Sequence, residues 1–392
     1  MTNRFTAAMA VATALLWLPG CGGGGGGIEG TGAPMQGVLR LSLTDAPACG
    51  YDSVHITIDR VRVHQSGSAA DADSGWSEVV LNPARRVDLL TLTNGVLEPL
   101  GQTELPPGKY TQLRLVLAPN TPATPFANSV KPTGGNETAL TTPSAQQSGL
   151  KLNTDIDIQA GQLADLALDF DACKSIVKRG NSGQYNLKPV ITVVPVAAGA
   201  GLRVVGYVDP AIALGSTQVS VQRDGVPVKA TVPDATGRFV LYPVPVGSYD
   251  LVVSAAGRVT AVMTGVPVVA VTPTMVNAST LPISPAITSQ RPVTGTVTPA
   301  SATVRALQAY TGGPTVEVAW GPVDAIAGSF GFALSVGAPV KAVYVASPGT
   351  PTFLPDAAAA SRYTLEAAAS GATRVKTIDT GSSVPPVIFV LP

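Results

Sequence analysis

The stretch VHITIDRVRV, residues 54–63, alternates apolar and polar side chains. Its apolar residues from Val54 to Ile58 share one face of an extended chain, and Val61 resumes the alternation with the phase shifted by one residue. A period of two is typical of a β-strand with one buried face. A β-bulge near residues 59–60 would keep both halves facing one core. The stretch therefore predicts a long, bulged strand.

The same period recurs along the chain, at residues 38–43, 113–117 and 166–170, and no long stretch has a helical period. Gly 41 and Pro 34 supply many turn residues. We therefore expect an all-β protein made of tandem antiparallel β-sandwich domains. A closing strand is expected over residues 187–196. Residues 118–148, rich in Pro, Thr, Asn and Gly, are expected to form a long loop or insertion.

The N-terminus has the pattern of an export signal. The apolar run at residues 7–18 is shorter than the roughly 20 residues that span a bilayer, which favours a signal peptide over residues 1–20. Residues 18–21, LPGC, resemble the lipobox of bacterial lipoproteins, which implies lipidation of Cys21 and, without a following Asp, the outer membrane. The alternative is an ordinary cleavage site beside an unrelated Cys. The glycine-rich residues 21–34 are expected to be a flexible tether.

Two cysteines remain once Cys21 is lipidated. An even pair in an exported chain predicts a disulfide between Cys49 and Cys173. Closing a loop of that length would contribute about 4–5 kcal/mol in the chain-entropy model. The alternative is a pair of buried free thiols.

Three domains are expected after the tether: an N-terminal β-sandwich domain at residues 35–197, a second module at 201–283 and a third at 291–392. The linker between the modules is expected over residues 280–290. Both modules have the sequence pattern of diverged copies of one unit. The shared features are Gly206, Gly237-Arg238-Phe239 and Val246-Gly247 in the second module, and Gly295, Gly328-Ser329-Phe330 and Val336-Gly337 in the third.

The N-terminal domain resembles an uncharacterised family of bacterial envelope lipoprotein domains. The resemblance implies a location and a fold, and no established activity. It rests on five motifs in order: LTDAP at 43–47, VDLL at 87–90, LPPGKY at 105–110, LDFD at 168–171 and YNLKPV at 185–190.

The second module resembles the carboxypeptidase regulatory-like, transthyretin-like β-sandwich, through GRF at 237–239, PVGSY at 245–249 and LVV at 251–253. The resemblance implies that Gly247 makes a hairpin turn and Tyr249 starts a core strand. Such sandwiches are grouped with carbohydrate-binding-like folds. The third module departs from the pattern, because Ala338 and Pro339 follow Gly337 where the family has a Tyr.

Few residues suggest chemistry. Asp45, Asp169 and Asp171 would bind Ca²⁺ if their carboxylates converged. The simpler expectation for Asp169 and Asp171 is a solvated outward position, alternating with Leu168 and Phe170 in the core. Ser175 and Lys178 match S-x-x-K without the partner motifs that such a nucleophile needs. His55 and His64 are expected on the surface, too few for a zinc site. We therefore expect no catalytic residues, no metal site and no cofactor.

The charge balance excludes one class of partner. Lys and Arg total 25 and Asp and Glu total 25, with no basic cluster, so no nucleic-acid partner is expected. The leading hypothesis is a non-catalytic lipid-anchored envelope protein that acts as a structural or protein-interaction module. One alternative is a carbohydrate-binding lipoprotein that uses the second module. Another is an accessory subunit or domain of an envelope hydrolase.

Overall fold

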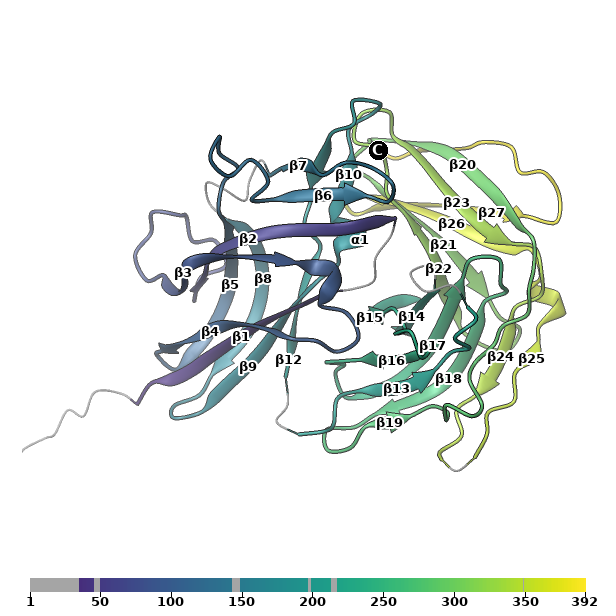
Figure 1. Cartoon of the computed structure of the whole chain (residues 1–392), viewed down its shortest axis with the longest axis horizontal. Helices are drawn as coiled ribbons and strands as arrows, with labels where there is room; N and C mark the ends of the chain where they lie inside the picture. Colours follow the sequence, from purple (N-terminus) through teal and green to yellow (C-terminus); the bar gives the residue numbers. More distant parts are fainter. Residues whose placement is uncertain (1–34, 46–49, 143–148, 197–198, 213–216, 348) are drawn as a thin grey trace, which may run out of the picture. The chain divides into compact units, whose positions relative to one another are not determined.

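The structure, a computed structural model, describes residues 35–392 apart from 46–49, 143–148, 197–198, 213–216 and 348. The predicted signal peptide, Cys21 and the tether, together with Cys49, lie outside the described residues. Nearly every element is a β-strand (Figure 1), which confirms the all-β prediction of tandem sandwiches. No helix among the described residues is long and apolar enough to cross a membrane.

The smaller sheet of the N-terminal domain has the order β12-β9-β1-β4. Its strands are β1 (Gly37–Asp45), β4 (Glu98–Leu105), β9 (Leu163–Phe170) and β12 (Ile191–Pro195). The central pair, β1 and β9, is parallel, whereas both edge strands pair antiparallel. The sheet is therefore mixed, although an antiparallel one was predicted.

The larger sheet of this domain has the order β10-β11-β7-β6-β2-β5-β8, with β3 also paired to β2. Its strands are β2 (Tyr51–His64), β3 (Ser77–Asp88), β5 (Gly108–Leu117), β6 (Ser129–Pro132), β7 (Thr138–Thr141), β8 (Leu150–Ile158), β10 (Ile176–Lys178) and β11 (Tyr185–Leu187). Two short helices interrupt the strands, η1 (Leu89–Thr91) and α1 (Ala172–Ser175). One hydrophobic cluster joins the sheets, with Leu41 and Phe170 from the smaller and Ile56 and Leu113 from the larger.

The predicted bulge is present in β2. Against β5, Ile58 pairs with Leu117 and Arg60 pairs with Val116, so Asp59 is the extra residue. Val54 and Ile58 before the shift and Val61 after it are all buried. The bulge thus keeps both halves of the strand on one core, as the phase change indicates.

Two sequence predictions about this domain were wrong. Residues 118–148 contain the hairpin β6–β7, which pairs with β2 and β11 and buries Val130. Such short strands carry too little alternation to be recognised. The closing strand expected at 187–196 is divided between β11 and β12, because Lys188 turns back and its backbone N–H donates to the Ser175 carbonyl.

The second and third modules have the same strand order. The second has sheets β16-β13-β19 and β15-β14-β17-β18, and the third has β23-β20-β28 and β22-β21-β26-β27. The first set is β13 (Val204–Tyr207), β14 (Thr217–Arg223), β15 (Val226–Thr231), β16 (Arg238–Leu241), β17 (Gly247–Ala255), β18 (Ala261–Val268) and β19 (Thr274–Met275). The second set is β20 (Gln290–Thr298), β21 (Thr303–Ala309), β22 (Thr315–Gly321), β23 (Ser329–Ser335), β26 (Arg362–Ala369), β27 (Ala372–Asp379) and β28 (Val387–Val390).

The repeated glycines have a common steric reason. Gly206 lies opposite Phe239 and Gly295 lies opposite Phe330 in the corresponding strand pairs. A Cβ atom at either glycine would approach the tip of the facing phenyl ring to 2.5 Å. Each module therefore needs a glycine where its buried Phe crosses the neighbouring strand, and the repeat that the sequence predicts is a repeat of core geometry.

The structure of the third module departs from that of the second after Gly337, where its sequence also departs from the repeat. After Gly337 the chain forms β24 (Val340–Val343), β25 (Leu354–Pro355) and the short helix η2 (Ala357–Ala359) before β26 begins. Strand β24 pairs in parallel with β18, so residues of the third module extend a sheet of the second. The expected linker is also tied to the second module, because Ile283 bridges Val208 and Ile287 bridges Arg258.

Candidate functional site

Lys229 of β15 is buried among polar groups of the N-terminal domain. Its ammonium Nζ lies 2.5 Å from Asp169 Oδ1, 3.3 Å from the Asp45 carbonyl and 3.4 Å from Thr44 Oγ1. The Lys229 side chain is 1% exposed and that of Asp169 is 9% exposed. We refer to Thr44, Asp45, Asp169 and Lys229 as the Lys229 cluster. It joins the adjacent ends of β1 and β9 to the second module.

Burial dominates the electrostatics of the two acids in this cluster. It raises the pKa of Asp45 well above its ordinary value, against the hydrogen bond from the Ala172 N–H to Asp45 Oδ1, which is 2.9 Å long. Burial also raises the pKa of Asp169, and Lys229 opposes that rise. Asp45 Oδ2 is buried and accepts no hydrogen bond from the residues that the structure describes. The cluster therefore contains one well-paired acid and one acid that is only half satisfied.

The three acids considered for calcium have separate roles. Asp45 and Asp169 are both buried, so the expectation of a solvated outward position was wrong for Asp169. Asp171 caps α1, where its Oδ1 accepts a hydrogen bond from the Lys174 N–H. Lys229 supplies the cation that Asp169 faces. Among the described residues, no three His, Cys, Asp or Glu side chains are grouped to hold a metal ion.

A β-bulge in β22 creates a second polar cluster. Ala306 pairs with Ala319 whereas Leu307 pairs with Glu317, so one extra residue lies between them in β22. Without that residue Glu317 and Trp320 would point to opposite faces, and with it they share one. Arg305, which lies opposite Trp320, is on the same face.

The acid at this bulge connects all three parts of the chain. Glu317 lies 3.4 Å from Lys174 of the N-terminal domain and 3.5 Å from Arg305 of its own module. Arg305 also contacts Glu366 and donates to the Gly225 carbonyl of the second module, each at 2.8 Å. Burial raises the pKa of Glu317, and the two cations oppose the rise.

Two amide side chains make further contacts between parts of the chain. The Gln222 amide of β14 donates to the Glu317 carbonyl at 2.7 Å and accepts from the Glu317 N–H at 2.8 Å. Asn94, in the turn before β4, accepts at its Oδ1 from the Val240 N–H of the edge strand β16 at 2.5 Å. Both side chains use free backbone groups of a strand as a neighbouring strand would.

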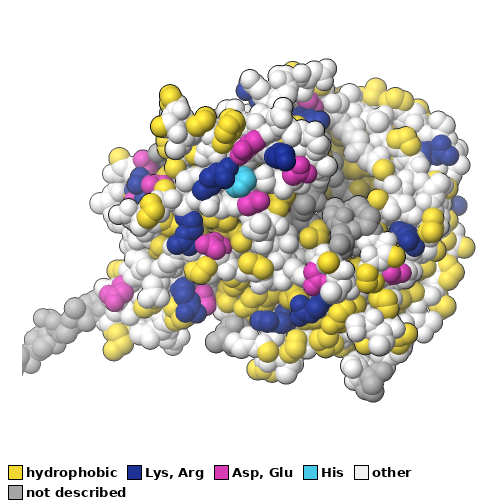
Figure 2. Space-filling model, viewed as in Figure 1, with side chains coloured by type: hydrophobic (Ala, Val, Ile, Leu, Met, Phe, Trp, Pro, Cys, Tyr) yellow, Lys and Arg dark blue, Asp and Glu magenta, His cyan; other side chains and the backbone are white. Residues whose placement is uncertain are grey.

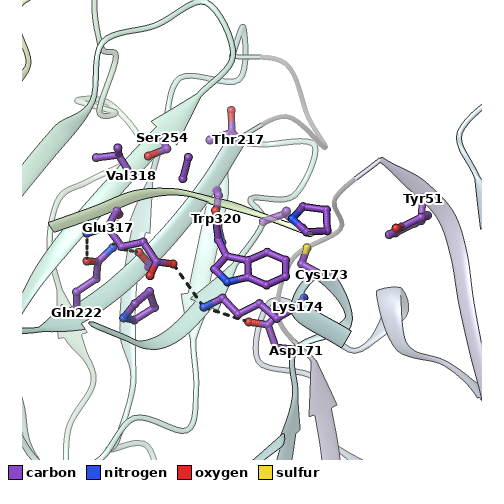
Figure 3. Close-up of a pocket in the computed structure, with 16 residues that line it drawn as sticks. Tyr51, Asp171, Cys173, Lys174, Thr217, Gln222, Ser254, Glu317, Val318 and Trp320 are labelled. Carbon is purple, nitrogen blue, oxygen red and sulfur yellow. Dashed lines mark hydrogen bonds and ion pairs between the residues drawn. The ribbon is translucent and has the colours of Figure 1, made fainter. Parts of the chain in front are cut away.

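A cavity of about 210 Å³ lies beside these contacts, lined by all three parts of the chain. In Figure 3 the Trp320 indole projects into it next to Lys174 and Cys173, and the contacts of Glu317 with Gln222 and Lys174 lie along one side. The charged lining groups, Asp171, Lys174 and Glu317, are paired with one another.

Other residues singled out from the sequence have structural partners. The Ser175 hydroxyl donates to the Asp171 carbonyl and accepts from the Val190 N–H, so it closes the α1 turn. His64 lies against the Trp76 ring, and His55 is partly buried beside Glu137, so neither is a freely exposed surface residue. Cys173 is disulfide-bonded. Because Cys49 lies outside the described residues, its pairing with Cys173 stays a prediction.

The surface seen in Figure 2 carries basic and acidic side chains side by side, without a broad area of one sign. Ion pairs also place opposite charges next to each other in the N-terminal domain, among them Arg85 with Glu98 and Arg86 with Glu137, each 2.7–2.8 Å apart. Alternating charges give no extended potential to attract a polyanion.

Comparison with known families finds one similarity, which lies in the N-terminal domain. Residues 36–189 match the family model DUF4382, described as a domain of unknown function. The match agrees with the predicted resemblance of this part of the chain to an uncharacterised family. No curated protein matches the chain.

Two similar solved structures are mutants of a type II cohesin–X-dockerin complex from Acetivibrio cellulolyticus. The chain from the N-terminal interface mutant is 22% identical, with 23% of this chain and 60% of that chain covered and a TM-score of 0.20. The chain from the C-terminal interface mutant is 24% identical, with 21% and 56% covered and a TM-score of 0.18. This protein thus covers less than two thirds of either, and at these TM-scores they do not inform its arrangement or its function.

Proposed function

We propose that this protein is a non-catalytic lipoprotein, anchored through Cys21 in the outer membrane, whose β modules act as a structural or protein-interaction scaffold in the cell envelope. The proposal rests on one observation: the ionisable residues where the three parts of the chain meet form ion pairs with one another. Lys229 binds Asp169, and Glu317 faces both Lys174 and Arg305. These groups are engaged in ion pairs between modules, whereas a catalytic acid or base must be free to exchange a proton with a substrate.

The anchor and the disulfide belong to the same proposal. A lipid on Cys21, followed by the glycine-rich residues 22–34, would hold the folded part near a membrane without fixing its orientation. A Cys49–Cys173 bridge would brace the end of β1 against α1, and it is supported by the bonded state of Cys173. Export is consistent with such a bridge, because disulfides persist in oxidising compartments.

Crosslinking in intact cells tests the scaffold proposal. Full-length protein and its Cys21→Ala variant are treated with an amine-reactive crosslinker and recovered under denaturing conditions. We expect discrete adducts with the wild type that decrease when the anchor is removed, because the tether no longer concentrates the scaffold at the membrane. Identical adducts from both variants would contradict an anchored scaffold.

A parallel assay with purified full-length protein tests the absence of catalysis. We expect no turnover of a panel of glycosidase, esterase and peptidase substrates. Turnover that is abolished by Glu317→Gln would establish an enzyme. The control is Glu104→Gln, which changes the same residue type at an exposed position of β4.

A further inference from the structure

The cavity beside Trp320 has the build of a small-molecule site. One wall comes from β14 and β17 of the second module, with Gln218 and Ser254 as cross-strand neighbours. The opposite wall is the bulged segment of β22 that carries Trp320, and Cys173 and Lys174 line the side that belongs to the N-terminal domain. Ligand sites prefer concave places where separate modules meet and a few polar groups converge.

Trp320 gives the cavity an accessible aromatic face. It is partly buried, and its indole N–H has no hydrogen-bond partner among the described residues. The position follows from the bulge in β22, which turns the ring to the face that also carries Arg305. A fixed ring with a free donor offers an apolar platform and a polar edge at the same place.

The wall opposite the ring is polar and uncharged. Gln218 is exposed and Ser254 is partly exposed, and neither side chain has a hydrogen-bond partner within the described part of the chain. Ser220 Oγ accepts a hydrogen bond from the Gln222 amide at 3.0 Å, so its own O–H stays available to donate. Amide and hydroxyl groups both donate and accept, as a ligand rich in hydroxyl groups requires.

The charged groups of the cavity are already satisfied. Lys174 lies between Asp171 and Glu317, at 3.6 Å and 3.4 Å. An anion would have to compete with two carboxylates for Lys174, and a cation would have to displace an ammonium group from Glu317. Binding of either ion would separate a charged side chain from its ion-pair partner, which costs free energy at a buried site.

The cavity continues past Trp320. A second cavity of about 290 Å³ shares Gln218, Ser254 and Trp320 with the first, and its other polar lining includes Thr260 and Gln290. The Arg258 guanidinium lies in this second cavity and donates to the Pro285 carbonyl. Polar groups thus continue on both sides of one indole ring, and Arg258 is the charged residue in the lining of the second cavity.

We propose that these two adjoining cavities form a binding site for a neutral saccharide, with one sugar ring against Trp320. A pyranose ring has C–H groups on its faces and hydroxyl groups at its edge, which matches an indole flanked by Gln218, Ser220 and Ser254. The site requires the second and third modules together and is not a property of the second module alone. It goes beyond the proposed scaffold function and does not depend on the anchor.

Fluorine NMR of full-length protein labelled with 5-fluorotryptophan tests the proposal. The protein is kept in a detergent without a sugar headgroup, and the signals are assigned with the Trp320→Phe and Trp76→Phe variants. The probes are glucose, galactose, mannose, N-acetylglucosamine, cellobiose and maltose at millimolar concentration. We expect at least one sugar to shift the Trp320 signal saturably and to leave the Trp76 signal unchanged.

Calorimetry with the sugar that shifts the signal then tests the residues. Trp320→Ala should weaken binding about tenfold or more, and Gln218→Leu about fivefold, whereas Trp76→Phe should bind like the wild type. A Trp320 signal that no sugar moves would overturn the proposal. So would full affinity in Trp320→Ala, or a shift produced by tetramethylammonium or inorganic phosphate and by none of the sugars.

Discussion

Replacing Lys229 with methionine should unfold the protein more easily, because it leaves Asp169 buried without its cation. The Lys229 and Asp169 side chains are 1% and 9% exposed, so solvent does not screen the pair. Removing one partner of a buried ion pair costs about 3–5 kcal/mol. The change also removes the Lys229 ammonium from the Thr44 hydroxyl and the Asp45 carbonyl. We therefore expect Lys229→Met to lower the free energy of unfolding by about 3–5 kcal/mol at pH 7.

Urea unfolding followed by circular dichroism measures this change. The double variant Lys229→Met with Asp169→Leu should recover most of the loss, because a well-packed apolar pair replaces a buried ion pair at little cost. Lys109→Met is the matched control, since its partner Asp155 is 76% exposed, and it should change stability by less than about 0.5 kcal/mol. A loss below about 1 kcal/mol in Lys229→Met, or a double variant no better than the single one, would refute the reasoning.

Three further predictions concern the contacts between the modules. Burial raises the pKa of Asp45 in the folded state, so the wild type is most stable below the ordinary Asp pKa and loses stability as pH rises through the folded-state pKa. The unfolding free energy of Asp45→Asn should therefore rise relative to that of the wild type between pH 4 and pH 8. A difference between the two proteins that stays the same over this pH range would contradict the raised pKa of Asp45. Gln222→Ala should cost about 2–3 kcal/mol in urea unfolding, because two backbone groups of β22 lose their partner, whereas Gln218→Ala, at an exposed position of the same strand, should cost under about 0.5 kcal/mol. Limited trypsin digestion should leave the bond after Lys341 uncut, because that residue lies inside β24, which pairs with β18 of the second module; rapid cleavage there would show that the second and third modules separate.

The strands of the cores could be predicted because their information is local. Alternation in β2 gives its buried face, and the shift between Ile58 and Val61 gives the bulge. Gly206 and Gly295 mark the repeat, because each meets a phenyl ring of its own module. Alternation and steric fit of this kind act within one sheet, so a single strand or strand pair reveals them.

The contacts between modules could not be predicted, because they join residues far apart in sequence. The residues on one face of β14 are the example: Gln218, Ser220 and Gln222 alternate with buried valines and have the pattern of a solvated face. In the structure Ser220 and Gln222 are buried, because Glu317 and its neighbours in the third module cover them. A polar face that is covered by another module has the same local pattern as one that is covered by water.

The departure of the third module from the repeat pattern at Ala338 was the one local sequence feature that indicated the contact between the second and third modules. The Tyr that the repeat requires is absent there, because β24 and β25 are inserted before β26 and β24 joins the sheet of the second module. Tyr363, near the start of β26, is buried, and its hydroxyl donates to the Ser335 carbonyl. A break in a repeat can therefore mark the place where one module extends its neighbour.

Fatty-acid labelling of cells that produce the full chain tests the anchored scaffold most directly. Cells grown with an alkyne-tagged palmitate express the wild type, Cys21→Ala or, as a control for cysteine loss, Cys173→Ala. We predict label on the wild type and on Cys173→Ala, and an unlabelled Cys21→Ala protein that leaves the membrane fraction. Equal labelling and equal membrane retention of the wild type and Cys21→Ala would contradict the account.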